Sequence, residues 1–278
     1  MRAACSLVIA VIALAACDRP PSLLICHNGN CNEPTDPARD DTLEALNESL
    51  ALEFDGKPLI DGIEVDSFWR GEDETCLYAH DLDAEQQTAA TAPAIELATH
   101  FARPGALTFS GGPFHVSLEL KAHVAVSKTA RHTPEQRRLH ALCAWDIYKI
   151  ISDGAVANGR EVEIVFSSFE PKLLAEVIAN APASTPTPYK FGAIYGIPAP
   201  LDAQTQPLGE YAGIPIDVVE IHAQWIHDAQ YEGIRSTGAE MVLWMFSATV
   251  ETFDAIEQYE PSMVVTSEAR LMRRWLEH

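Results

Sequence analysis

The stretch Gly62–Asp81, GIEVDSFWRGEDETCLYAHD, opens with alternating apolar and acidic residues, a pattern that predicts a strand. Side chains two residues apart on a strand share a face, so the carboxylates of Glu64 and Asp66 point the same way. They repel each other unless a cation lies between them, and a divalent ion that takes oxygen ligands would meet this need. A second short apolar run then ends at His80, a candidate acid or base. Taken alone, the stretch also fits a polar hairpin with a solvated rim.

Strand patterns alternate with helix patterns along the rest of the chain. This alternation predicts an α/β fold with a parallel sheet and crossover helices. About eight strands are expected, and a single (β/α)8 TIM barrel takes roughly 250 residues, which matches residues 22–278. The expected strands are Leu23–Cys26, Ile63–Asp66, His115–Lys121, Val162–Phe166, Phe191–Ile197, Asp217–Ile221, Glu240–Phe246 and Met263–Val265. The expected helices are Thr42–Leu52, part of Ala84–Phe101, Pro134–Ala157, Pro171–Asn180, Gln224–Thr237, Thr249–Tyr259 and Glu268–Leu276.

The composition is that of a globular protein with a strongly acidic surface. Of the 278 residues 47% are hydrophobic, enough for one sizeable core, and the formal net charge is -21. A polyanionic surface argues against nucleic acid as a partner and against electrostatic docking to anionic lipid.

The N-terminus predicts export. Arg2 precedes an apolar run, Leu7–Leu14, that is too short to span a bilayer, and small residues then lead to Cys17. This order resembles a bacterial lipoprotein signal, which implies a signal peptide over residues 1–16, lipidation of Cys17 and a tether over residues 17–21. The protein would then be anchored to a membrane by its lipid and face the periplasm or the cell exterior. An ordinary secretory signal cut nearby is the alternative.

Four cysteines remain if Cys5 leaves with the signal and Cys17 carries lipid. An oxidising compartment permits disulfides between them, and a bridge between Cys31 and Cys76 is plausible because both are expected in loops beside candidate site segments. The sequence does not fix the pairing. The four are Cys26, Cys31, Cys76 and Cys143.

Chemically reactive side chains fall at or near the carboxyl ends of the expected strands, where TIM barrels carry their active sites. His27 follows the first strand, and Glu119 and Lys121 share a face at the end of another. Together with Glu64, Asp66 and His80, these residues predict one site at one end of the barrel.

The order of these pieces resembles the glycerophosphodiester phosphodiesterases of the phospholipase-C-like phosphodiesterase superfamily. The resemblance covers nearly the whole mature chain. It rests on an early His-x-Gly, then Glu-x-Asp, then His-Asp, then Leu-Glu-Leu-Lys, and on three later pieces. These are Phe166–Pro171, similar to a Ser-Phe-acidic-Pro segment, Val242–Trp244, similar to a late strand ending in Trp, and Val264–Thr266, similar to the usual last strand.

The reaction expected on these grounds is metal-dependent hydrolysis of a small-molecule phosphodiester. Glu64, Asp66 and Glu119 would hold a divalent cation, Mg²⁺ or Ca²⁺, that neutralises charge on the phosphoryl oxygens. Lys121 would add a positive charge, or serve only as an ion-pair partner of Glu119. His27 and His80 would act as acid and base, with the assignment between them open. The nucleophile is either water or a hydroxyl next to the phosphate, which would give a cyclic phosphate.

Two departures from the family bear on the substrate. Asn28 stands where the family commonly has Arg, so a phosphate contact can be missing, and Asp40-Asp41-Thr42 replaces a Glu-Asn-Thr signature. Asn28 and Trp244 are nevertheless expected to contact substrate. Two alternatives stay open: a sphingomyelinase-D-like or phospholipase-D-like enzyme of the same superfamily, and a non-catalytic lipoprotein that binds a phosphate ligand.

Overall fold

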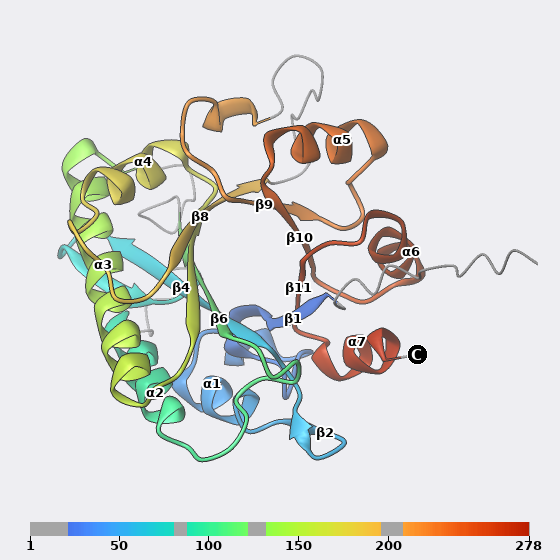
Figure 1. The fold of residues 1–278 in the computed structure, drawn as a ribbon. Coiled ribbons are helices and arrows are strands. Elements are labelled where there is room, and N and C mark those ends of the chain that lie inside the picture. The colour runs from blue at the N-terminus through green and yellow to red at the C-terminus, as the bar shows by residue number, and fades with distance from the viewer. Residues whose placement is uncertain (1–21, 81–87, 122–131, 196–207, 278) are drawn as a thin grey trace, which may run out of the picture.

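Eight parallel strands close into a barrel in the computed structural model, which describes residues 22–80, 88–121, 132–195 and 208–277. Figure 1 looks along the barrel and shows the helices outside the ring of strands. The single (β/α)8 barrel predicted from the alternating pattern is therefore confirmed. In order around the barrel the strands are β1 (Leu23–Cys26), β4 (Gly62–Arg70), β6 (Phe114–Leu120), β7 (Val162–Ser168), β8 (Tyr189–Tyr195), β9 (Val218–His222), β10 (Glu240–Met245) and β11 (Met263–Thr266).

Pairing of the first barrel strand with both β11 and β4 closes the sheet. Leu23 pairs with Met263 on one side, and Cys26 pairs with Ile63 on the other. The strands are almost wholly buried, as expected for a parallel sheet covered by helices.

The helices pack their apolar faces against the outside of the barrel. They are α1 (Leu43–Ser49), α2 (Thr91–Phe101), α3 (Pro134–Ala157), α4 (Pro171–Ala179), α5 (Asp228–Thr237), α6 (Val250–Tyr259) and α7 (Ala269–Leu276). The long helix α3 begins as expected, because Thr133 and Gln136 form a capping box and Pro134 occupies the first turn. Helix α5 begins four residues later than Gln224, because His227 caps it. No helix in the described ranges is long and apolar enough to cross a bilayer.

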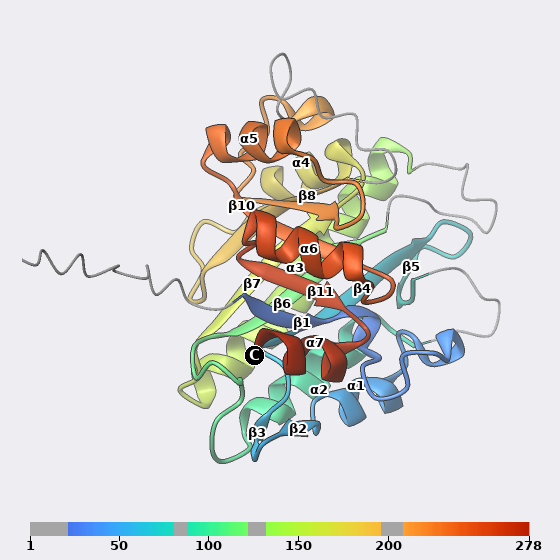
Figure 2. The same cartoon turned by 90° about the vertical axis from the view of Figure 1, so that its right-hand side faces the viewer.

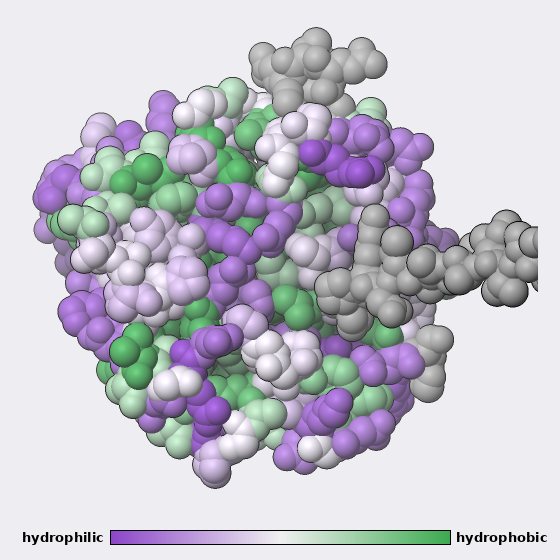
Figure 3. Space-filling view, viewed as in Figure 1, coloured by the Kyte–Doolittle hydropathy of each residue, from purple (hydrophilic) through white to green (hydrophobic). Residues whose placement is uncertain are grey.

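Ion pairs hold the amino-terminal end of the barrel together. Buried Arg273 donates to Asp61 at 2.6 Å, and Lys190 lies 2.9 Å from Glu163 and 2.7 Å from Glu240. Figure 3, which views this end, shows hydrophilic residues across its middle. The candidate side chains gather at the other end, so this end is a structural one, in keeping with how TIM barrels divide stability from function.

His80 was expected at the end of a barrel strand, but the segment that leads to it is not part of the barrel. It forms β5 (Thr75–Tyr78), which pairs antiparallel with the last residues of β4 and lies outside the ring. Figure 2 shows β5 running beyond the barrel with the end of β4. His80 therefore reaches the carboxyl end of the barrel from a hairpin. A small second hairpin joins β2 (Glu53–Phe54) and β3 (Lys57–Pro58).

The disulfides correct the expected pairing of Cys31 with Cys76. Cys26 is bonded to Cys31, and Cys76 is bonded to Cys143. The first closes the loop that follows β1, and the second ties β5 to α3. Each bridge therefore fixes a segment that carries a candidate histidine, His27 in one case and His80 in the other.

Candidate active site

Three carboxylates meet at the carboxyl end of the barrel because of strand register. Glu64 and Asp66 lie two residues apart on β4, and Asp66 pairs directly with Glu119 on β6. All three side chains are buried, and their oxygens lie within 4.8 Å of one another. The acidic alternation in the sequence therefore gives the clustered carboxylates that it predicted.

Lys121 provides positive charge beside this cluster. Its ammonium nitrogen lies 2.6 Å from Glu119 Oε1 and 2.9 Å from Asp66 Oδ2. Although burial lowers the pKa of Lys121, the carboxylates of Asp66 and Glu119 outweigh burial and raise it, so the side chain is charged at neutral pH. Lys121 is thus the ion-pair partner that the sequence suggested, and it also lines the cavity described below.

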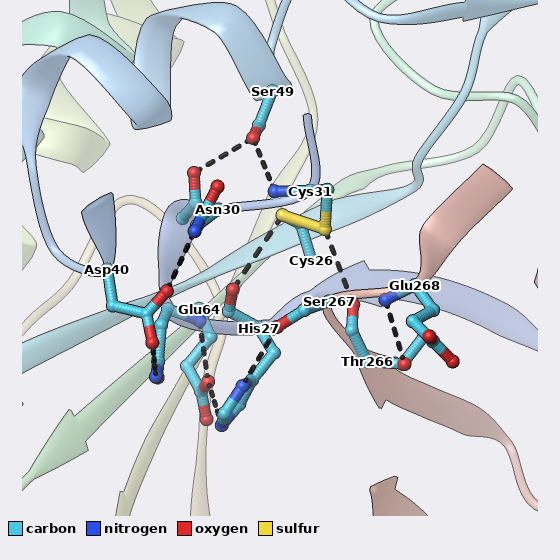
Figure 4. Close-up of a disulfide and its surroundings, with 12 residues drawn as sticks. Cys26, His27, Asn30, Cys31, Asp40, Ser49, Glu64, Thr266, Ser267 and Glu268 are labelled. Atoms are coloured by element: carbon cyan, nitrogen blue, oxygen red, sulfur yellow. Dashed lines mark hydrogen bonds and ion pairs between the residues drawn. A yellow bond between two sulfur atoms is a disulfide. The ribbon is translucent and has the colours of Figure 1, made fainter. Parts of the chain in front are cut away.

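The loop after β1 presents His27 to the same carboxylates. Its Nε2 lies 3.5 Å from Glu64 Oε2, and its Nδ1 lies 3.3 Å from the hydroxyl of Ser267, which follows β11. Figure 4 shows this histidine next to the Cys26–Cys31 disulfide. Burial and the charge of Lys121 lower the pKa of His27 to about 3, which favours the neutral imidazole.

Asn28 shapes this loop. Its backbone is left-handed (φ 50°), a conformation that asparagine tolerates better than most residues, and its N–H donates to Glu64 Oε2 at 3.1 Å. Its side-chain amide donates to Asp40, and it is not among the described residues that line the cavity. The direct substrate contact expected of Asn28 stays a prediction, while its contacts here are to Glu64 and Asp40.

A cavity of about 200 Å³ opens beside the carboxylates. Its lining includes both charged and apolar side chains, so the cavity could hold a molecule that carries a charged group and a non-polar one. The polar lining residues are His27, Glu64, His80, Glu119, Lys121 and Glu220, and the apolar ones are Phe169, Ile194, Trp244 and Phe246. The two expected histidines and Trp244 therefore meet at the cavity that the metal-binding candidates also line.

Two acidic residues of the site were missed by the sequence analysis as site residues. Asp41 was considered only as part of a departure from the family, but it is buried, and this burial and the charge of Asp66 raise its pKa, while Thr42 caps α1. Glu220 lies inside the barrel on β9. A Cβ on Gly192 would come within 3.1 Å of Glu220 Oε1, so the glycine makes room for this carboxylate. A lone Glu in the apolar run Val218–Ile221 was the available signal.

The site carries more buried negative charge than one lysine can balance. Burial and the neighbouring charge of Asp66 raise the pKa of Glu64 and that of Asp41 well above the ordinary range. Burial and Glu119 raise the pKa of Glu220 to about 8. Asp66 has no hydrogen-bond partner among the described residues for either carboxylate oxygen, apart from its ion pair with Lys121.

Glu64, Asp66 and Glu119 therefore fit a divalent cation. They offer clustered carboxylate oxygens, the donor type that Mg²⁺ and Ca²⁺ prefer, and a cation there would relieve the repulsion between them.

Solved structures with this architecture include enzymes that act on phosphodiesters. A glycerophosphodiester phosphodiesterase from Parabacteroides distasonis superposes with a TM-score of 0.56 at 13% identity, covering 92% of this chain and 97% of that one. A phosphodiesterase from Oleispira antarctica, solved with the product sn-glycerol-3-phosphate, gives 0.54 at 12%, covering 93% and 98%. The chain has the fold of the glycerophosphodiester phosphodiesterases.

A more distant likeness is to a calcium-dependent phosphoinositol-specific phospholipase C from a Pseudomonas species. Its TM-score is 0.52 at 10% identity, with 90% of each chain covered. No family model and no curated protein matches the chain by sequence. The resemblance noted in the sequence is therefore confirmed at the level of the fold.

Glu64→Gln is expected to change stability in opposite directions with and without metal. Because the folded state raises the pKa of this carboxyl, its ionised form costs stability at neutral pH, so the variant should unfold at a higher temperature than wild type in EDTA. Excess Ca²⁺ should raise the melting temperature of the wild type and leave that of the variant nearly unchanged. Thermal unfolding followed by circular dichroism measures both effects.

The matched control is Glu72→Gln, which neutralises an exposed carboxylate in the turn between β4 and β5. It should respond to Ca²⁺ as the wild type does. A Glu64→Gln variant that is less stable than wild type in EDTA, or equally stabilised by Ca²⁺, would contradict the assignment of Glu64 to a cation site.

Proposed function

We propose that the protein is a metal-dependent phosphoric diester hydrolase that acts on glycerophosphodiesters or related phospholipid headgroups. The observation that carries the proposal is the meeting of two histidines, His27 and His80, with the carboxylates and Lys121 around one cavity. A site that only binds phosphate needs positive charge but has no need of an acid and a base. The likeness of fold to known phosphodiesterases supports the same reaction class.

The position of each residue in the site suggests its role in the reaction. Glu64, Asp66 and Glu119 would hold a divalent cation, Mg²⁺ or Ca²⁺, which when bound neutralises charge on the phosphoryl oxygens. Lys121 would bind a phosphoryl oxygen as a fixed positive charge. One imidazole would take the proton of the nucleophile, and the other would protonate the leaving alkoxide.

Glu64 and Ser267 orient His27 through contacts to its two ring nitrogens, and the Cys26–Cys31 bridge closes the loop around it. His80 arrives from β5, which the Cys76–Cys143 bridge fixes to α3. Two separately anchored histidines can therefore serve opposite ends of one scissile bond.

A lipid substrate, as in the sphingomyelinase-D-like alternative, has support from one feature. Phe169 and Phe246 line the cavity, yet 40% and 63% of their surfaces are exposed. An apolar rim of this kind could contact the acyl part of a lysophospholipid or sphingomyelin next to the headgroup.

Hydrolysis of glycerophosphocholine and bis(p-nitrophenyl) phosphate by the protein lacking residues 1–17 tests the proposal. Turnover should require Mg²⁺ or Ca²⁺ and disappear in EDTA. His27→Ala and His80→Ala should each lower kcat by about 10²–10⁴-fold, the usual contribution of an acid or a base.

His115→Asn is the control, because His115 Nδ1 lies 3.3 Å from Glu163 Oε1 at the opposite end of the barrel. This variant should keep kcat within about twofold of wild type. If neither compound turns over with either metal, sphingomyelin and lysophospholipids are tried next. Turnover of those supports the sphingomyelinase-D-like alternative, and no turnover of any substrate favours the non-catalytic binding protein.

We further propose that the protein is a lipoprotein anchored through Cys17. The support is the order of charged, apolar and small residues that leads to this cysteine. When the full chain is expressed in a bacterial host, labelled palmitate should be incorporated and the protein should sediment with membranes. Cys17→Ala should abolish both. Release of a soluble, unlabelled wild-type protein would support the ordinary secretory signal instead.

A further inference from the structure

Three aromatic rings form one wall of the cavity, and their relative orientation is that of a box. The ring of Phe169 stands at 88° to that of Trp244, with centroids 6.5 Å apart. The ring of Phe246 also stands at 88° to Trp244, with centroids 5.2 Å apart. All three residues line the cavity, so a group placed there meets ring surfaces of more than one orientation. We call Phe169, Trp244 and Phe246 the aromatic wall.

Neighbouring rings hold this wall in place. His222 packs edge-on against Trp244 with centroids 4.5 Å apart, and it stacks on Trp225 at 4.0 Å. Trp244 pairs in register with His222 across β10 and β9, so the backbone ladder sets the contact. Trp244 is therefore fixed from the side by rings that are not among the described residues lining the cavity.

The wall lies in an acidic cavity. Glu220 lines the same cavity from β9 and is only 3% exposed. The ion pairs of Lys121 go to Asp66 and Glu119. A divalent cation and Lys121 together would balance the three metal-binding carboxylates. Glu220, whose pKa burial and Glu119 raise to about 8, would then ionise when a cationic group is bound beside it on the side of the aromatic wall.

The elements that carry these groups lie on opposite sides of the barrel. The carboxylates come from β4 and β6, whereas Glu220 and Trp244 come from β9 and β10 across the barrel, and Phe246 follows β10. Phe169 follows β7, which is the neighbour of β6, and reaches Trp244 from there. A phosphodiester with its phosphate at the metal-binding side would therefore extend its alcohol group toward the aromatic wall.

We propose that the aromatic wall and Glu220 bind a quaternary ammonium group on the alcohol of the substrate, so that the enzyme prefers choline phosphodiesters. This inference rests on the proposed function. A trimethylammonium group is attracted to the faces of aromatic rings, most strongly to tryptophan, and needs no hydrogen-bond acceptor. The carboxylate supplies the countercharge. A glycerol or inositol group would instead require several hydrogen-bonding partners, whereas the faces of the three rings offer none and the one N–H of the aromatic wall, Nε1 of Trp244, lies at a ring edge.

The test compares glycerophosphocholine with its neutral isostere, in which a 3,3-dimethylbutyl group replaces choline. The two alcohols have the same shape and differ in charge, so the ratio of their kcat/KM values isolates the recognition of the cation. The ratio should be about tenfold or more in the wild type. It should fall toward one in Trp244→Leu and Phe246→Leu, which keep apolar bulk but remove a ring.

Phe253→Leu is the matched control, because its ring stacks on Trp275 and is not among the described residues lining the cavity. It should keep the wild-type ratio. A preference for choline over its neutral isostere supports the proposal, and lysophosphatidylcholine compared with lysophosphatidylglycerol then shows whether the same ammonium group is also recognised on a lipid. Equal kcat/KM values for choline and its neutral isostere in the wild type would overturn it.

A failure of the proposed function can be distinguished from a failure of the ammonium site. If no phosphodiester is hydrolysed, calorimetric binding of phosphocholine and of 3,3-dimethylbutyl phosphate to the full chain with Ca²⁺ replaces the kinetic ratio. Tighter binding of phosphocholine, weakened by Trp244→Leu, supports the ammonium site in a protein that is not a hydrolase. Equal affinities or no binding of either would overturn it.

Discussion

Repulsion among buried carboxylates is the constraint on which the site depends. Glu64, Asp66 and Glu119 lie together because the register of β4 and β6 places them there, and Asp41 adds a fourth carboxyl. Lys121 compensates only part of this charge. Such a cluster costs stability in the free protein, so its presence is better explained by a cation that it binds than by any contribution to folding.

The fold holds the carboxylates and the two histidines around them in fixed positions despite this repulsion. Asp66 and Glu119 sit on strands that are paired on both sides, which leaves them little room to separate. The two histidines reach the site on segments outside the barrel, and each of those segments is tied down by a disulfide. The metal-binding candidates therefore lie on rigid strands, and the candidate acid and base lie on segments fixed by disulfides. The disulfides matter because loops alone hold side chains less precisely than strands do.

Much of this architecture could be predicted from the sequence. Few folds are compatible with alternating strands and helices, and in a parallel barrel the carboxyl ends of the strands lie together. The carboxylate cluster followed from spacing within a strand. Disulfide pairing did not, because it depends on how β5 folds back on β4 and so brings Cys76 to Cys143 of α3, which no local pattern encodes. Glu220 was missed because a single glutamate in an apolar strand can be recognised as a site residue only when its neighbours in the fold, such as Gly192, are known.

The most direct test of the account is a crystal structure of the wild-type protein soaked with Mn²⁺ and glycerol 3-phosphate, with anomalous data collected for the metal. The account predicts one manganese ion bound by oxygens of Glu64, Asp66 and Glu119 at about 2.0–2.3 Å, with the phosphate between this ion and Lys121. No anomalous peak among these three carboxylates, or a phosphate bound elsewhere, would contradict it.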